Sequence, residues 1–310
     1  MLKRAISYGR RFTRPAPWQN DNLLEIGTRD IFTDDHDLAR EQFRRFWRSI
    51  DRSRVTQWEE QGFVDPAFWR EVGKQGLIGI ETAAEVGGHG GDFLTHITTC
   101  EEQVYASVPG NFLIQSDMVL PYLAKYGTTE QQEHFIPKMI AGECIGAIAM
   151  SEPHAGSNLQ GMKTFARRDG DDFVINGSKV FISNGFNADM ILLCCLTDRD
   201  VKAAHGMSIF CIDTTTPGFK KGRVLKKLGM KSSDTAELFF EDMRVPASAV
   251  LSGTNGLNRG FYFLMHDLGR ERLMLSVNTL ANCENMFEQT RRYCHEREAF
   301  GGPLIKKQQV

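Results

Sequence analysis

Two polar segments near the middle of the sequence contain the residue types of a ligand-binding site. The first, AMSEPHAGSNLQG at residues 149–161, runs from an apolar stretch into a turn rich in Gly, Ser and Asn. The second, GSKVFISNG, spans residues 177–185. Such turns present backbone N–H groups and hydroxyls, which suit an anion or the polar edge of a heterocycle. Taken by themselves, these residues favour an ordinary polar β-turn, and binding is the second interpretation.

Motifs for nucleotide, metal and serine hydrolase sites are missing from the sequence. No stretch satisfies GxGxxG, and the GxxxxG spacing at 156–161 is followed by Met162 where a phosphate-binding Lys is needed. Neither His89 nor His154 has a second ligand at metal spacing, and no HExxH or GxSxG occurs. We therefore expect neither a metal site nor serine hydrolase chemistry.

Composition places the chain among ordinary globular proteins. The 310 residues carry a formal net charge of −2, which gives no basic excess for nucleic acid binding. No apolar run approaches the ~20 residues of a transmembrane helix. The seven cysteines include no CxxC pair, so we expect buried free thiols in a reducing compartment.

The N-terminal residues differ in charge from the rest of the chain. Five basic residues and no acidic residue precede Asp21. This composition is typical of a mitochondrial presequence, which we expect over residues 1–30. A disordered basic tail is the alternative.

The pattern of the first ~145 residues is mainly helical. Residues 34–62 have helical periodicity, and the arginines among them, including Arg40 and Arg44, are interpreted as a solvated face. Thr128 with Gln131 has the spacing of a capping box.

A β-rich pattern begins at residue 144. Residues 173–175 and 180–182 predict a hairpin that turns at Asn176-Gly177. The later strand patterns have no helices between them, which favours an antiparallel barrel or sandwich. From Gly260 a long amphipathic helix is predicted, interrupted at Gly269.

Together these segments resemble the acyl-CoA dehydrogenase family, flavoenzymes that oxidise the α–β bond of acyl-CoA thioesters. AMSEPHAGSN resembles the family's flavin-binding signature, and VFISNG resembles its second flavin segment. REAFGGPLIKKQ, residues 297–308, is similar to the segment that contacts FAD across a subunit interface. The resemblance covers nearly the whole chain after about residue 30 and agrees with the order of helices, strands and helices.

The resemblance implies an α+β multidomain fold. We expect a helical N-terminal domain over 31–143, an antiparallel β-barrel middle domain over 144–257, and the start of a C-terminal helical bundle over 258–310. Compared with the family, the chain is expected to be truncated at its C-terminus. A bundle truncated in this way would expose the apolar faces of the helix at 273–293.

The resemblance also implies site residues. Glu271 stands where the long-chain and isovaleryl branches have their catalytic base, and Ser157 and Arg272 match substrate contacts. His154 and Asn158 depart from the Gly and Asp usual in the signature. The positions that match FAD contacts are Ile148, Met150, Ser151, Gly156, Ser157, Phe181 and Ser183, with Arg297, Phe300 and Gln308 reaching across the subunit interface.

The implied activity is FAD-dependent dehydrogenation of a long-chain acyl-CoA in fatty-acid β-oxidation in the mitochondrial matrix. The family passes its electrons to electron-transferring flavoprotein and usually forms a homotetramer. An isovaleryl-type substrate is the alternative within the family, and an acyl-CoA oxidase is a second enzymatic alternative. A non-catalytic remnant that binds acyl-CoA or full-length subunits is the alternative of another class.

Overall fold

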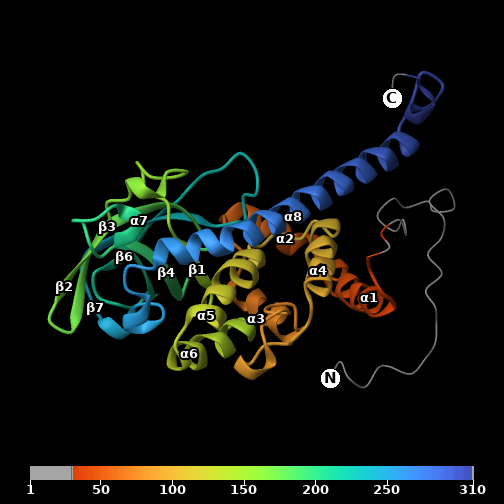
Figure 1. The fold of residues 1–310 in the computed structure, drawn as a ribbon. Helices are drawn as coiled ribbons and strands as arrows, with labels where there is room; N and C mark the ends of the chain where they lie inside the picture. Colours follow the sequence, from red (N-terminus) through yellow and green to blue (C-terminus); the bar gives the residue numbers. More distant parts are fainter. Residues whose placement is uncertain (1–28, 30, 309–310) are drawn as a thin grey trace.

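A helical N-terminal part, a curled β-sheet and one long helix make up the structure, a computed structural model that describes residue 29 and residues 31–308 (Figure 1). The presequence predicted over 1–30 therefore lies almost entirely outside the described residues. The main helices are α1 (Asp34–Arg48), α2 (Arg52–Gln61), α3 (Pro66–Lys74), α4 (Phe93–Tyr105), the π-helix η5 (Ile114–Val119), α5 (Leu120–Tyr126), α6 (Thr129–Ile140), α7 (Ala203–Gly206) and α8 (Gly260–Glu296). Short 3₁₀ helices are η4 (Ala84–Val86), η6 (Leu159–Gly161), η7 (Ala247–Ala249), η8 (Gly253–Gly256) and η9 (Leu304–Lys306).

The segment 34–62, which is predicted to be helical, forms two separate helices, α1 and α2. Asp51 separates them as the N-cap of α2, where its carboxylate accepts the backbone N–H of Ser53 at 2.8 Å. The break changes the chain direction and lets both Trp47 and Trp58 enter the core, at 2% and 0% exposure. Propensity alone cannot reveal such a break, because helical residues stand on both sides of it.

The solvated face predicted for the arginines of α1 is confirmed for Arg45 and Arg48, which are exposed, but not for Arg40 and Arg44. Arg40 pairs with Glu101 at 2.6 Å, and Arg44 donates to Glu102 at 2.9 Å. Both glutamates lie on α4 and are buried. The prediction was wrong for Arg40 and Arg44 because their partners come from a helix some sixty residues further along the chain.

The capping box at the start of α6 is confirmed. The Gln131 backbone N–H donates to the Thr128 hydroxyl at 3.3 Å, and the Gln131 side chain accepts the Thr128 N–H at 3.1 Å. The same Gln131 amide donates to the carbonyls of Ser248 and Val250, both at 2.9 Å. One capping residue therefore also ties α6 to the end of the sheet.

The middle part is a seven-stranded sheet in the order β1-β4-β2-β3-β7-β6, with β5 paired to β4. Most neighbours are antiparallel, as predicted, but two pairs are parallel: β2 with β4 at a single residue pair, and β1 with β4. The β2–β3 pair lies between them in sequence and supplies the long crossover that a parallel pair needs. The strands are β1 (Gly146–Ala149), β2 (Phe165–Asp169), β3 (Asp172–Ser183), β4 (Met190–Leu196), β5 (Met207–Asp213), β6 (Phe219–Val224), β7 (Thr235–Pro246), and the small pair β8 (Glu298–Ala299) and β9 (Gly302–Pro303).

The hairpin predicted at Asn176-Gly177 is wrong. Strand β3 runs through both residues, and the turn from β2 to β3 contains Gly170 instead, at φ 65°. Gly177 has φ 151°, and a Cβ there would lie 2.4 Å from the Thr164 hydroxyl oxygen. The register of β3 against β7 shifts at this point. Gly177 therefore permits a bulge and a close approach, not a reversal of the chain.

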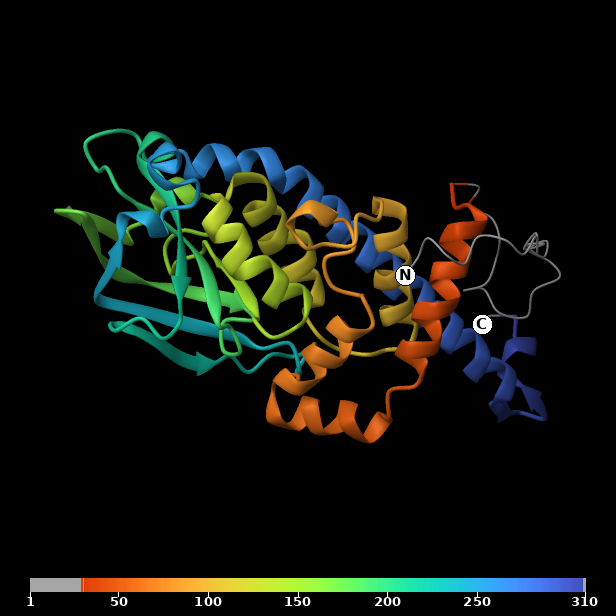
Figure 2. The same ribbon diagram turned by 90° about the horizontal axis from the view of Figure 1, so that it is seen from below.

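Helix α8 continues without a break from Gly260 to Glu296, so the predicted interruption at Gly269 is wrong. A Gly costs a helix about 1 kcal/mol, which packing along a 37-residue helix outweighs. Figures 1 and 2 show α8 crossing the helical part and extending past it toward the C-terminus. Large apolar side chains are exposed on it, including Leu273, Leu275, Leu280, Met286 and Phe287.

Two large apolar clusters stabilise this arrangement. One joins the N-terminal helices to the inner face of the sheet and the start of α8, and the other fills the sheet's second face. Six of the seven cysteines are buried free thiols, as predicted, whereas Cys283 is exposed. None of the described helices is long and apolar enough to cross a membrane.

Candidate active site

A cavity of about 320 Å³ opens between the loop after β1 and the first turns of α8. The loop contributes Met150, Ser151, Gly156 and Ser157 to its lining, and α8 contributes Met265 and Arg272. Five of the predicted site residues, which lie up to 122 positions apart in sequence (Met150 to Arg272), therefore meet at one concave surface. The helix supplies apolar surface, and the loop supplies hydroxyls and backbone groups.

A buried ion pair holds this loop against the sheet. Lys179, on β3, donates to the Met150 carbonyl and to the Glu152 carboxylate, each at 2.9 Å. The same carboxylate accepts the backbone N–H groups of Lys163 and Thr164, at 2.7 and 3.0 Å. Burial alone would raise the pKa of Glu152, but Lys179 and these N–H groups outweigh it and lower that pKa. The loop is therefore fixed by four interactions that meet at one carboxylate and one ammonium group.

The turn at Gly156 to Asn158 leaves backbone donors available. Among the described residues, none accepts a hydrogen bond from the N–H groups of Gly156, Ser157 or Asn158. A Cβ added at Gly156 would meet nothing within 4 Å, so the turn borders open space. Adjacent unpartnered N–H groups attract anions such as phosphate. The turn can thus bind a negatively charged group at the mouth of the cavity.

Glu271 directly precedes Arg272 of the cavity lining on α8; it is 4% exposed and is not itself a lining residue. Its Oε1 accepts the Tyr122 hydroxyl at 2.9 Å. Burial raises the pKa of Glu271, and Asp267 adds to this, whereas Tyr122, Arg270 and Arg272 act in the opposite direction. A carboxylate with a raised pKa is a stronger base once it is ionised, which suits proton abstraction.

Comparison with known proteins agrees with this geometry. The models of the acyl-CoA dehydrogenase N-terminal, middle and C-terminal domains match residues 33–143, 147–243 and 258–310. The long-chain specific acyl-CoA dehydrogenase of Mus musculus mitochondria is 49% identical over 290 residues, which cover 93% of this chain and 67% of that protein. The chain belongs to the acyl-CoA dehydrogenase family. The predicted family, fold and enzyme class are thereby confirmed.

Solved structures of acyl-CoA dehydrogenases have the same fold. An acyl-CoA dehydrogenase from Geobacillus kaustophilus superposes with a TM-score of 0.86 at 38% identity, covering 91% of this chain and 74% of that one. A glutaryl-CoA dehydrogenase from Mycobacterium smegmatis, solved in complex with FADH2, gives a TM-score of 0.81 at 28% identity, covering 90% and 70%.

The second flavin segment predicted from the resemblance to acyl-CoA dehydrogenases, residues 180–185, lies beside the first, residues 149–158. The Val180 N–H donates to the Ser151 carbonyl at 3.0 Å, which places Phe181 next to the end of β1. Phe181 is 67% exposed and has φ 61°. An exposed aromatic ring in a strained backbone conformation is typical of a functional position. Ser183 follows on the same strand, and Ile148 is buried within β1.

The three predicted cross-subunit residues do not reach this cavity within one chain. Arg297, Phe300 and Gln308 follow the C-terminal end of α8, and Phe300 is 92% exposed. About 30 helical residues separate them from Met265, which corresponds to roughly 45 Å along the axis. A role in flavin binding would therefore require a second copy of the chain, as the resemblance implies.

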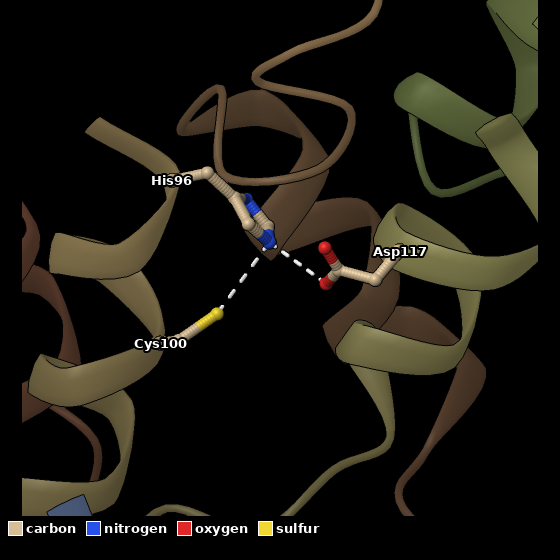
Figure 3. Close-up of side chains that lie close together, drawn as sticks. All are labelled: His96, Cys100 and Asp117. Carbon is tan, nitrogen blue, oxygen red and sulfur yellow. Dashed lines mark hydrogen bonds and ion pairs between the residues drawn. The ribbon is translucent and has the colours of Figure 1, made fainter. Parts of the chain in front are cut away.

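A buried cluster of His96, Cys100 and Asp117 was not predicted from the sequence (Figure 3). His96 Nε2 lies 2.7 Å from Asp117 and 3.5 Å from the Cys100 sulfur. Since one nitrogen faces both partners, the imidazole cannot relay a proton from thiol to carboxylate. Arg270 donates to the other Asp117 oxygen at 3.0 Å, and its positive charge opposes a metal cation. We interpret the cluster as a charge-compensated structural contact between α4, η5 and α8.

Tyr122 was not predicted either, although a signal was present. Tyr122 and Tyr126 are four residues apart, and so are Asp267 and Glu271. Such spacing places each pair on one helix face. The sequence does not reveal that the two faces meet, because α5 and α8 are more than 130 residues apart.

Proposed function

We propose that this chain is an FAD-dependent dehydrogenase of long-chain acyl-CoA, in which Glu271 is the base that removes the α-proton. The observation that carries the proposal is the cavity that five predicted contact residues line, with the buried Glu271 directly before one of them, Arg272, on α8. The 49% identity to a long-chain specific enzyme supports the choice of substrate.

We assign a separate role in the reaction to each of three residues, Glu271, Arg272 and Ser157. An α-proton of a thioester is weakly acidic, so its removal needs a positioned carboxylate in a site with little water. Glu271 supplies this carboxylate, and Arg272 stabilises its ionised form and contacts the substrate at the cavity wall. The Ser157 side chain binds the polar part of the acyl-CoA at the cavity mouth.

The residues around the loop fit a flavin. FAD, when bound, supplies the acceptor for the hydride that leaves the β-carbon. Ile148 on β1 and Met150 and Ser151 in the loop after it would hold its ring, with Phe181 and Ser183 on β3. The unpartnered N–H groups at Gly156 and Ser157 would bind its pyrophosphate.

The assembly and the electron acceptor follow from the family. The chain forms a homotetramer in which Arg297, Phe300 and Gln308 of one copy contact FAD in another. Their distance from the cavity of their own chain supports this role. Electron-transferring flavoprotein then reoxidises the enzyme.

Chain length can be tested by flavin bleaching. Anaerobic stopped-flow mixing with a saturated C16 acyl-CoA should reduce the flavin at least about tenfold faster than isovaleryl-CoA does, because each buried methylene contributes about 0.8 kcal/mol. Faster bleaching by isovaleryl-CoA would favour the alternative substrate. Peroxide formation in air would indicate an oxidase, and a protein without bound flavin would indicate the non-catalytic remnant.

Import into mitochondria is the expected fate of the N-terminus. A reporter fused to residues 1–30 should enter the matrix, because basic presequences without acidic residues are drawn inward by the membrane potential. The matched control replaces Lys3, Arg4, Arg10, Arg11 and Arg14 with Gln and should remain cytosolic. A cytosolic parental reporter would contradict the matrix localisation.

A further inference from the structure

Helices α5 and α8 meet through two tyrosine–carboxylate hydrogen bonds. The Tyr122 hydroxyl donates to Glu271 Oε1 at 2.9 Å, and the Tyr126 hydroxyl donates to Asp267 Oδ2 at 2.5 Å. Both tyrosines lie on α5 and both acids on α8, each pair four residues apart. The two contacts are therefore successive turns of one antiparallel helix interface.

The surroundings of the two acids differ. Asp267 also accepts the ammonium group of Lys125 at 3.0 Å, and Tyr126 stacks on Phe263 with ring centroids 4.1 Å apart. Within the described part of the chain no cation forms an ion pair with Glu271, and Tyr122 is fully buried. Among the described residues, no group donates a hydrogen bond to the second Glu271 oxygen, Oε2. The ionisable groups that face Glu271 are Tyr122 from α5, Asp267, Arg270 and Arg272 from α8, and Cys194 from β4.

Tyr122 remains a donor over the whole working range of pH. Burial raises the pKa of its phenol, and the neighbouring Glu271 carboxylate raises it further. The Cys194 thiol also stays protonated, because burial raises its pKa to about 12. The Tyr122 hydroxyl and the Cys194 thiol therefore both keep their protons while the Glu271 carboxyl group titrates.

We propose that Tyr122 is a positioning residue for the base, which holds Glu271 by Oε1 and leaves Oε2 to take the α-proton. This inference rests on the proposed role of Glu271. A hydrogen bond to an ionised carboxylate stabilises that form and offsets part of the effect of burial. It also fixes the rotamer, so that the free oxygen has one direction. Tyr126, by contrast, holds the helices together without contact to the base.

The test compares Tyr122→Phe with the matched variant Tyr126→Phe in the purified flavoprotein. Each removes one hydroxyl from the same helix and leaves the ring in place. For Tyr122→Phe we expect the apparent pKa for flavin reduction by C16 acyl-CoA to rise by about one unit, as loss of a bond to a charged group predicts. The limiting rate at high pH should fall about tenfold, because the carboxylate is no longer oriented.

For Tyr126→Phe the rate and its apparent pKa should stay within about twofold and 0.3 units of the parental values, since Lys125 still pairs with Asp267. The double variant Tyr122→Phe/Glu271→Gln should be no slower than Glu271→Gln alone. Flavin content and unfolding midpoint, measured on each protein, separate catalysis from folding.

The outcomes distinguish this inference from the function on which it rests. If Glu271→Gln abolishes bleaching but Tyr122→Phe keeps the parental rate and pKa, the positioning role is overturned and Glu271 remains the base. Equal slowing by both tyrosine variants with an unchanged pKa would show a merely structural role and would also overturn it. If Glu271→Gln bleaches at the parental rate, the proposed function itself fails.

Discussion

Glu271→Gln is expected to slow flavin reduction by about 10²–10⁴-fold, because general base catalysis contributes that much. The amide has nearly the same shape as the carboxylate but cannot accept the α-proton. The flavin should stay bound, since its expected contacts on β1, β3 and the turn at Gly156 lie outside α8. Stopped-flow bleaching by a long-chain acyl-CoA, with the flavin-to-protein ratio as the second readout, measures both effects.

Asp267→Asn is the matched control for this variant. Asp267 is a buried acid one turn before Glu271, and it bonds to Tyr126 in the way that Glu271 bonds to Tyr122. Because Asp267 pairs with Lys125 and is not the proposed base, its amide should change the bleaching rate by less than about tenfold. A parental rate for Glu271→Gln, or equal loss in both variants, would contradict a specific role for Glu271.

The parental enzyme should also show the titration of the base. Burial raises the pKa of Glu271, and only the ionised form can accept a proton. The reduction rate should therefore increase with pH through a value above the ordinary 4.5 of a Glu side chain. This increase should be absent from Glu271→Gln.

Lys179→Met is expected to have the largest effect on stability. The Lys179 side chain is fully buried and donates to Glu152 and to the Met150 carbonyl. Its loss leaves a buried carboxylate without its cation, which costs about 3–5 kcal/mol of the free energy of unfolding. Urea unfolding monitored by circular dichroism measures this change. Flavin content should fall as well, because these two bonds hold the loop that carries Ser151 and Ser157.

The exposed pair of Lys220 with Glu241 provides the control. Both side chains are more than half exposed, so Lys220→Met should cost less than about 1 kcal/mol. The two variants remove the same charge, which isolates the effect of burial. A cost for Lys179→Met as small as that for Lys220→Met would show that the loop does not depend on this ion pair.

The same pair predicts a pH dependence. The pKa of Glu152 is lowered in the folded chain, so its contribution to stability is present above the ordinary value of 4.5. That contribution is lost as the pH falls through the lower folded pKa. In Lys179→Met the acid-induced loss should be smaller, because the cation that lowers the pKa is gone.

Local rules in the sequence determined several features directly. The capping box of Thr128 and Gln131 was confirmed, because its two hydrogen bonds lie within four residues. The order of helices, strands and a long helix also followed from periodicity. The family resemblance rested on contiguous segments such as AMSEPHAGSN, and these were enough to predict Met150, Ser151 and Ser157 as site residues.

Other features depended on partners that the sequence does not place. Arg40 and Arg44 have the spacing of a solvated face, but two buried glutamates on α4 neutralise them. Gly177 has the residue type of a turn, but the close approach of Thr164 keeps it inside a strand. In each case a contact formed across more than ten residues outweighed the local preference.

The site itself shows the same division. The residue type and position of Glu271 could be read from the sequence, and its assignment as the base remains a prediction. Its burial, its raised pKa and its hydrogen bond to Tyr122 arise only when α5 packs against α8. This packing brings together Tyr122 and Glu271, which are 149 residues apart in the sequence. The sequence alone can nominate a carboxylate, whereas the tertiary structure decides its solvation and its partners, and these set whether a carboxylate can act as a base.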